Sequence, residues 1–148
     1  PSAYAYKLFS DSCGNSVSRP GLVHVSGGLA ARQMRSALYR RDNGESTLIL
    51  WFEPMLRPWG QARVSLDLGA ADGIPVVHDI GSDYAQALLN DHLLLGEKPA
   101  VITWKSAEAE TPVRIKAVSS PVDALWLLFA AGMSLSAIAA VIRGKTIG

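Results

Sequence analysis

Cysteine is almost absent from this sequence: Cys13 is the only one among 148 residues. A single thiol cannot close an internal disulfide, and it cannot supply the several thiolates of a structural metal cluster. The three histidines, His24, His78 and His92, have neither HxH nor HxxxH spacing, so a histidine-based zinc site has little support. These absences exclude a disulfide-rich scaffold and fit a reducing compartment.

Long runs of charge and low-complexity segments are also missing. The chain is 49% hydrophobic and 18% charged, which is a globular composition. Its length is sufficient for one sizeable core and too short for two ordinary domains. We therefore predict a single globular domain over residues 1–148.

The net charge of the chain is only +1, but the charges are spread unevenly. Residues 1–63 hold eight Lys and Arg against four Asp and Glu, residues 64–112 two against eight, and residues 113–148 four against one. This order predicts a basic face for nucleic acid or nucleotide beside an acidic cluster. The alternative is a set of solvated faces whose charges pair with one another.

The hydrophobic pattern predicts more strands than helices. Alternating or β-rich runs occur at Tyr4–Ser10, Leu22–Ser26, Ser46–Glu53, Ala62–Leu68, Ile74–Ile80, Ala100–Lys105 and Pro112–Val118. Helical periodicity occurs at Leu29–Arg41, Ser82–Leu95 and Pro121–Ala131. Because the strands come in runs, we predict an α+β fold: a mixed sheet covered by two to four helices.

The segment Ala124–Ile142 holds 19 consecutive uncharged residues, enough to qualify as a transmembrane candidate. Gly132 favours the end of one helix and Ser134 the start of another, so we favour a buried pair of short helices. We accordingly expect a cytoplasmic protein, with association with the inner membrane left open as the alternative.

One junction has the composition of a phosphate site. A short apolar strand runs into Gly27 and Gly28, and the helical pattern that follows carries Arg32 and Arg35. Free N–H groups at a helix N-terminus attract anions, glycines admit them closely, and the arginines stand one helical turn apart. This predicts that these four residues bind the phosphates of ATP or DNA. The alternative is an ordinary Gly-Gly turn, because neither the GxxxxGK[ST] nor the GxGxxG pattern is present.

The arrangement of Val25–Ala37 resembles the phosphate-binding corner of the ParB/sulfiredoxin superfamily. Gly27 and Gly28 match its glycines, and Arg32 stands one residue later than its arginine. The catalytic cysteine of sulfiredoxins has no counterpart here, so reductase chemistry is not implied. The chain as a whole also resembles plasmid fertility-inhibition proteins of the oncogenic suppression type. That resemblance implies an ATPase and metal-dependent deoxyribonuclease that acts on transferred DNA, contacts the DNA-transfer apparatus and blocks conjugation or T-DNA transfer.

Such activities would need ATP, Mg²⁺ and carboxylates that hold the metal and orient water. Carboxylates occur at predicted strand ends at Glu53, Asp67, Asp72 and Asp79, and we take Glu53 and Asp79 as the catalytic candidates. His78, next to Asp79, is a candidate for acid–base chemistry. No two-metal spacing is present, so the metal ligands stay unassigned. The alternative is that the carboxylates are solvated turn residues and that His78 is a half-buried strand residue.

Aromatic residues suggest a second mode of nucleic-acid binding. Trp51, Phe52, Trp59 and Trp104 are candidates for stacking on single-stranded bases. Trp51 and Trp104 lie within apolar strands, so we expect core packing for at least one of them.

Two further function classes compete with the enzyme hypothesis. Residues 87–125 loosely resemble secreted invasion-associated proteins, which implies a non-enzymatic envelope or periplasmic β-rich interaction module. The other class is an inhibitor or interaction protein without an active site.

Overall fold

A computed structural model describes residues 3–52, 62–80, 84–96, 98–108 and 110–118. The chain divides into Pro1–Val118 and Ser119–Gly148, and every described residue belongs to the first unit. The predicted helix Pro121–Ala131 and the apolar segment Ala124–Ile142 lie outside the described residues. The single-domain arrangement of residues 1–148 therefore stays a prediction.

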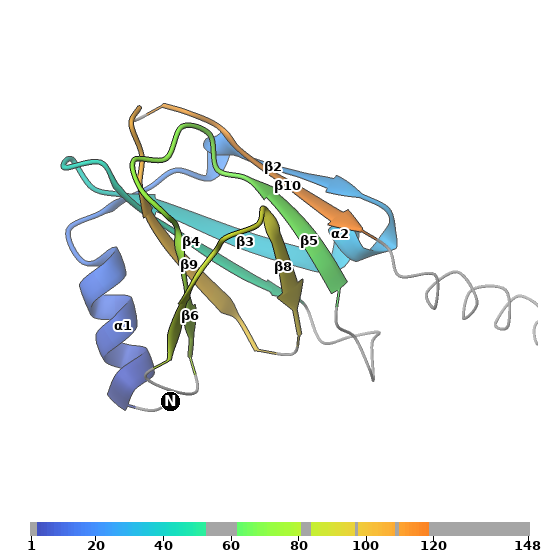
Figure 1. The fold of residues 1–148 in the computed structure, drawn as a ribbon, viewed down its shortest axis with the longest axis horizontal. Helices are drawn as coiled ribbons and strands as arrows, with labels where there is room; N and C mark the ends of the chain where they lie inside the picture. The colour runs from blue at the N-terminus through green and yellow to red at the C-terminus, as the bar shows by residue number, and fades with distance from the viewer. Residues whose placement is uncertain (1–2, 53–61, 81–83, 97, 109, 119–148) are drawn as a thin grey trace, which may run out of the picture. The chain divides into compact units, whose positions relative to one another are not determined.

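The described residues form two β-sheets (Figure 1). Sheet A is fully antiparallel and has the order β1 (Val17–Ser18), β3 (Met34–Arg40), β4 (Glu45–Phe52), β9 (Ala100–Lys105), β6 (Val76–Asp79), β7 (Ala85–Ala87). Sheet B has the order β2 (Val23–Gly27), β10 (Val113–Val118), β5 (Ala62–Asp67), β8 (His92–Leu95). In sheet B, β2 runs parallel to β10, and the other pairs are antiparallel.

The predicted α+β class is wrong, because the described part of the chain is mostly β-sheet. It contains ten strands and two short α-helices, α1 (Ala3–Cys13) and α2 (Leu29–Gln33), with one 3₁₀ turn, η1 (Pro20–Leu22). The two to four helices expected to cover a single sheet are replaced by a second sheet. The cause is that two segments with apparent helical periodicity are strands.

One hydrophobic core joins the inner faces of the two sheets. Leu38, Leu48, Ile102 and Val77 form a cross-strand row on sheet A. Sheet B contributes alternate residues of its strands, among them Val64, Leu66, Val113, Ile115 and Leu95. Full burial of one such side chain stabilises the fold by about 1.5–3 kcal/mol, so these rows fix which face of each strand points inward.

The predicted helix Leu29–Arg41 is wrong beyond Gln33, where the chain enters β3. Met34, Leu38 and Arg40 are buried, and Arg35 between them is exposed. Positions 30, 34 and 38 fit a helical spacing of four and also a strand period of two, so the sequence pattern was ambiguous. Met34–Arg40 forms a strand because it pairs with Ser46–Phe52.

The other helix errors have the same origin. The predicted helix Ser82–Leu95 contains β7 and β8 instead, which pair with β6 and β5. Conversely, the predicted strand Tyr4–Ser10 belongs to helix α1. This helix ends where Gly14 N–H donates to Ser10 O (2.9 Å) and Asn15 takes the left-handed conformation, with φ 56°.

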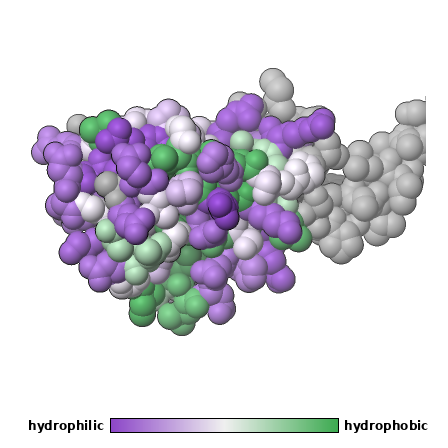
Figure 2. Space-filling view, turned by 90° about the horizontal axis from the view of Figure 1, so that it is seen from above, coloured by the Kyte–Doolittle hydropathy of each residue, from purple (hydrophilic) through white to green (hydrophobic). Residues whose placement is uncertain are grey.

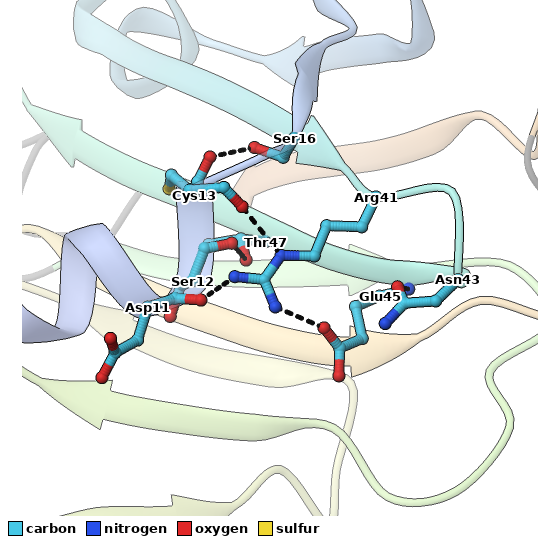
Figure 3. A network of polar contacts seen from close by, with 9 residues as sticks. Asp11, Ser12, Cys13, Ser16, Arg41, Asn43, Glu45 and Thr47 are labelled. Atoms are coloured by element: carbon cyan, nitrogen blue, oxygen red, sulfur yellow. Dashed lines mark hydrogen bonds and ion pairs between the residues drawn. The ribbon is translucent and has the colours of Figure 1, made fainter.

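Helix α1 is fixed to the outer face of sheet A by polar contacts (Figure 3). Arg41 Nε donates to Gly14 O (3.1 Å), and its guanidinium also donates to Asp11 O. Arg41 Nη1 forms an ion pair with Glu45 Oε2 at 2.6 Å. This hydrogen bond from Arg41 holds the pKa of Glu45 below its usual value. Thr47 Oγ1 of β4 donates to Ser12 O (2.9 Å), so Thr47 and Arg41, which follows β3, satisfy carbonyls at the helix C-terminus.

Gly27 ends β2 at a point where two backbones meet. Its φ is +120°, and a Cβ built there would lie 2.2 Å from Ala117 O on β10. A side chain at this position would clash with backbone, which cannot move without breaking the parallel pairing of β2 with β10.

We expect Gly27→Ala to destabilise the protein by about 3 kcal/mol, through positive-φ strain and the clash with Ala117 O. Gly73→Ala is the matched control, because Gly73 has φ +98° and no atom within 4 Å of an added Cβ. That control should lose only about 1 kcal/mol from backbone strain. Urea unfolding of both variants measures the difference, and equal losses would contradict the close-packing explanation.

Arg41→Gln should lower the free energy of unfolding by about 1 kcal/mol, because it removes the contacts with the end of α1 and with half-exposed Glu45. Arg32→Gln is the control at an exposed helix position, where we expect a change within about 0.5 kcal/mol. The measurement is denaturant unfolding at neutral pH. A parent-like stability of Arg41→Gln would show that the contacts of Arg41 do not contribute to holding α1.

Candidate phosphate-binding surface

The four residues predicted to bind phosphate lie together at one corner. Gly27 ends β2, Gly28 precedes α2, Arg32 lies on α2, and Arg35 is the second residue of β3. Arg35 Nη1 donates to Arg32 O at 3.2 Å. The structure thus brings these residues close to one another, and their binding of phosphate stays a prediction.

The corner has less support for an anion than the sequence suggested. Helix α2 has only five residues, so it lacks the length that gives a strong dipole at its N-terminus. The Arg35 guanidinium is directed towards the carbonyls of Arg32 and Met34. The close approach of β10 requires a glycine at position 27, so no bound ligand is needed to account for Gly27.

The outer face of sheet B presents a larger basic surface. Alternation along β10 buries Val113, Ile115 and Ala117 and leaves Arg114 and Lys116 exposed. On neighbouring β5, Arg63 is exposed on the same face, diagonally adjacent to Lys116 through the pairs Lys116–Ser65 and Val118–Arg63. We call Arg63, Arg114 and Lys116 the basic cluster.

Other polar residues surround the basic cluster on this face. His24 and Ser26 of β2 pair with Arg114 and Lys116, and His92 of β8 pairs with Ser65. Figure 2 looks onto the side where β2 and β10 lie in Figure 1, and its surface is largely hydrophilic with scattered hydrophobic residues. This part of the molecule therefore presents a polar surface to solvent.

The basic cluster forms no ion pair with the described residues, and its three cations outnumber Asp67, the one carboxylate that the strands of sheet B place on this face. Among the described residues, ion pairs join Arg41 to Glu45 and Lys105 to Asp72, and neither involves the cluster. Asp67 lies opposite Arg114, but its Oδ1 accepts a hydrogen bond from Gly69 N–H (3.1 Å). The cluster therefore keeps its positive charge available for an external anion.

Of the two predicted catalytic carboxylates, the structure describes only Asp79, so their catalytic role stays a prediction. Glu53 lies outside the described residues, and Asp79 ends β6 on sheet A, with its N–H donating to Tyr84 O (3.0 Å). Asp67 accepts from its own turn, and Asp72 pairs with Lys105 Nζ at 3.6 Å. Within the described ranges, no group of three or more His, Cys, Asp or Glu side chains is placed to hold a metal ion.

His78 is a half-buried strand residue, as the alternative interpretation had it. Its Nε2 lies 2.9 Å from Thr103 Oγ1, and burial lowers its pKa below the usual value. Successive strand residues point to opposite faces, so His78 and Asp79 diverge and cannot act as a pair. The predicted acid–base combination is therefore wrong.

The aromatic candidates differ in how deeply their side chains are buried. Trp104 is buried in the core, which confirms core packing for at least one tryptophan. Trp51 is half-buried on β4, Phe52 packs against the core, and Trp59 lies outside the described residues. Stacking on bases by these residues stays a prediction.

One buried cation has a structural explanation. Arg40 lies on β3 and is buried, and its Nη2 donates to Thr111 O at 2.6 Å. Burial lowers the pKa of Arg40, and nearby Glu110 opposes this effect. The side chain thus ties sheet A to the turn that leads into β10.

Comparison of the chain with protein-family models, curated proteins and solved structures finds no match. The assignment of a site therefore depends on the residues and their geometry. The basic cluster was missed at the sequence level, although its signal was present: the alternation in "VRIKAV" places Arg114 and Lys116 on one face of a strand.

Among the described residues, no helix combines the length and the apolar composition needed to cross a membrane. The segment Ala124–Ile142 is not covered by this finding, so its predicted helix pair stays a prediction.

The depressed pKa of His78 gives a testable pH dependence. The unfolded chain, with an ordinary His pKa of about 6.5, binds a proton before the folded chain does. Stability is therefore fully present above that pH and falls as the pH drops through the folded pKa. Replacing His78 with Gln should reduce this loss between about pH 7 and 5, measured by denaturant unfolding. A histidine NMR titration that gives His78 a raised pKa would contradict it.

Proposed function

We propose that the protein binds the phosphate backbone of nucleic acid on the outer face of sheet B. The observation that carries this proposal is the basic cluster: Arg63, Arg114 and Lys116 lie on one exposed face, without an ion pair among the described residues. Arg114 and Lys116 are two residues apart on one strand, a separation of about 6.8 Å. Such a row of cations complements the regularly spaced charges of a phosphate backbone.

The composition of this face favours binding without sequence preference. Its exposed residues are mostly basic, polar or aliphatic, with Leu94 and Val118 at one end and the acidic Asp67 opposite Arg114. On the described outer face, His24 and His92 are the only rings that offer a surface for base stacking. Phosphate contacts position a nucleic acid but carry no base information, so the expected ligand is any DNA or RNA strand.

The wider hypothesis, a plasmid-encoded fertility-inhibition factor that acts on transferred DNA, depends on resemblance alone. In that hypothesis the corner formed by Gly27, Gly28, Arg32 and Arg35 binds the phosphates of ATP or DNA. ATP with Mg²⁺, the catalytic roles of Glu53 and Asp79, and contact with a DNA-transfer apparatus belong to the same hypothesis. Binding by sheet B needs none of these, so it can be tested separately.

A non-enzymatic β-rich interaction module is the second candidate. The observation that favours it is the architecture itself, with ten strands in two sheets among the described residues. In this case the exposed face of sheet B contacts another protein. Absence of nucleic-acid binding at low salt would favour this candidate.

Arg114→Gln/Lys116→Gln should weaken binding to a fluorescein-labelled oligonucleotide by at least about tenfold at low salt. The slope of log K against log salt should fall by about two, one for each phosphate contact removed. Fluorescence anisotropy at several salt concentrations, with single-stranded and duplex probes, measures both quantities. Thermal unfolding should change little, because both side chains are exposed.

Two matched variants locate the site. Lys7→Gln/Lys105→Gln removes the same charge from α1 and sheet A, and it should bind like the parent. Arg32→Gln/Arg35→Gln tests the corner, where a comparable loss would place phosphate there as well. If the parent shows no salt-dependent binding to either probe, the proposal is wrong.

A further inference from the structure

Strand β7 forms one edge of sheet A, where it pairs with β6 and with no other described strand. Residues 84–90, with the sequence YAQALLN, contain no charge and no proline. Edge strands usually carry charged residues or proline, because an edge without them can pair with strands of other chains. By contrast, Arg19 and Pro20 follow β1, and Lys98 and Pro99 follow β8. The edge strand β2, with the sequence VHVSG, also has no charge or proline within it, so β7 and β2 are the less protected of the described edges.

The hydrogen bonds with β6 show which backbone groups of β7 face outward. Asp79 N–H donates to Tyr84 O (3.0 Å), and Leu88 N–H donates to Pro75 O (2.7 Å). Successive residues of a strand point their backbone N–H and C=O groups to alternate sides. These groups therefore face β6 at Tyr84, Gln86 and Leu88, and they face the open side at Ala85 and Ala87. Ala87 O already accepts from Leu89 N–H (3.1 Å), and a carbonyl can accept a second bond.

We propose that two copies of the chain associate through antiparallel pairing of β7, with Gln86 on the two-fold axis. The outward groups then match: Ala85 of one copy lies opposite Ala87 of the other, in the pair type that exchanges both N–H···O bonds. The sequence Ala-Gln-Ala is the same in both directions about Gln86, so the register is self-complementary, as a two-fold interface requires.

Exposed apolar side chains flank this edge. Ile74 is 63% exposed, Tyr84 63% and Leu89 77%. The Leu88–Pro75 hydrogen bond brings Leu89 near Ile74 at one end of β7, and Tyr84 lies at the other end. Two-fold pairing about Gln86 sets Tyr84 opposite Leu88 of the second copy, so apolar surface at both ends is covered. An interface this small, below about 1,200 Å², gives a weak and reversible dimer.

Charge substitution at Ala85 and Ala87 tests the dimer and its register. Both side chains are exposed, so substitution should preserve the monomer fold. Ala85→Lys/Ala87→Lys places like charges opposite each other across the axis, whereas Ala85→Lys/Ala87→Glu places opposite charges there. Sedimentation velocity at about 10–500 µM covers the range in which such an interface equilibrates.

The full-length parent should shift with concentration from 15.8 kDa towards twice that mass. The Lys/Lys variant should stay monomeric, and the Lys/Glu variant should associate at least about tenfold more tightly than Lys/Lys. Thermal unfolding in dilute solution checks that both variants fold. A parent that is monomeric throughout, or a dimer with equal affinity in both variants, would overturn the proposal.

Discussion

The position of β10 at the centre of sheet B is the constraint on which most of the fold depends. It pairs in parallel with β2 and antiparallel with β5, so it joins Val23–Gly27 to Val113–Val118 across most of the described chain. Its inward residues are buried in the common core. Because side chains alternate along a strand, the burial that stabilises β10 also forces Arg114 and Lys116 into solvent. The core and the basic cluster are consequences of the same periodicity.

The approach of β10 to β2 also changes the meaning of Gly27. A glycine before a helix suggests an anion site when only the sequence is considered. The distance from its missing Cβ to Ala117 O shows that strand packing already requires it. A feature with a sufficient structural cause is weak evidence for a ligand. The alternation along β10 explains why Arg114 and Lys116 are exposed, but it does not require these exposed residues to be cations, which is why they support the proposed function better.

The two sheets differ in what covers their outer faces. Helix α1 lies against sheet A, held by Arg41 and Thr47 and by an edge-to-face contact between Phe9 and Tyr39, with ring centroids 6.2 Å apart. No described helix covers the outer face of sheet B. Sheet A also changes along its width, from β4, paired on both sides, to the short edge strand β7. Its centre supplies stability, and at its edge the outward N–H groups of β7 have no hydrogen-bond partner among the described residues.

The sequence by itself determined most strands and which of their faces is buried. Alternation of apolar and polar residues over six or more positions fits a strand and not a helix, as in Ala62–Asp67 and Val113–Val118. It could not decide whether Met34–Arg40 and His92–Leu95 are helices or strands, because their apolar positions fit both the helical and the strand period. Pairing with a partner strand decides this. Only the tertiary structure placed Arg63 beside Lys116 and explained Gly27. Each of these depends on contacts between residues distant in the chain, and local periodicity carries no information about such contacts.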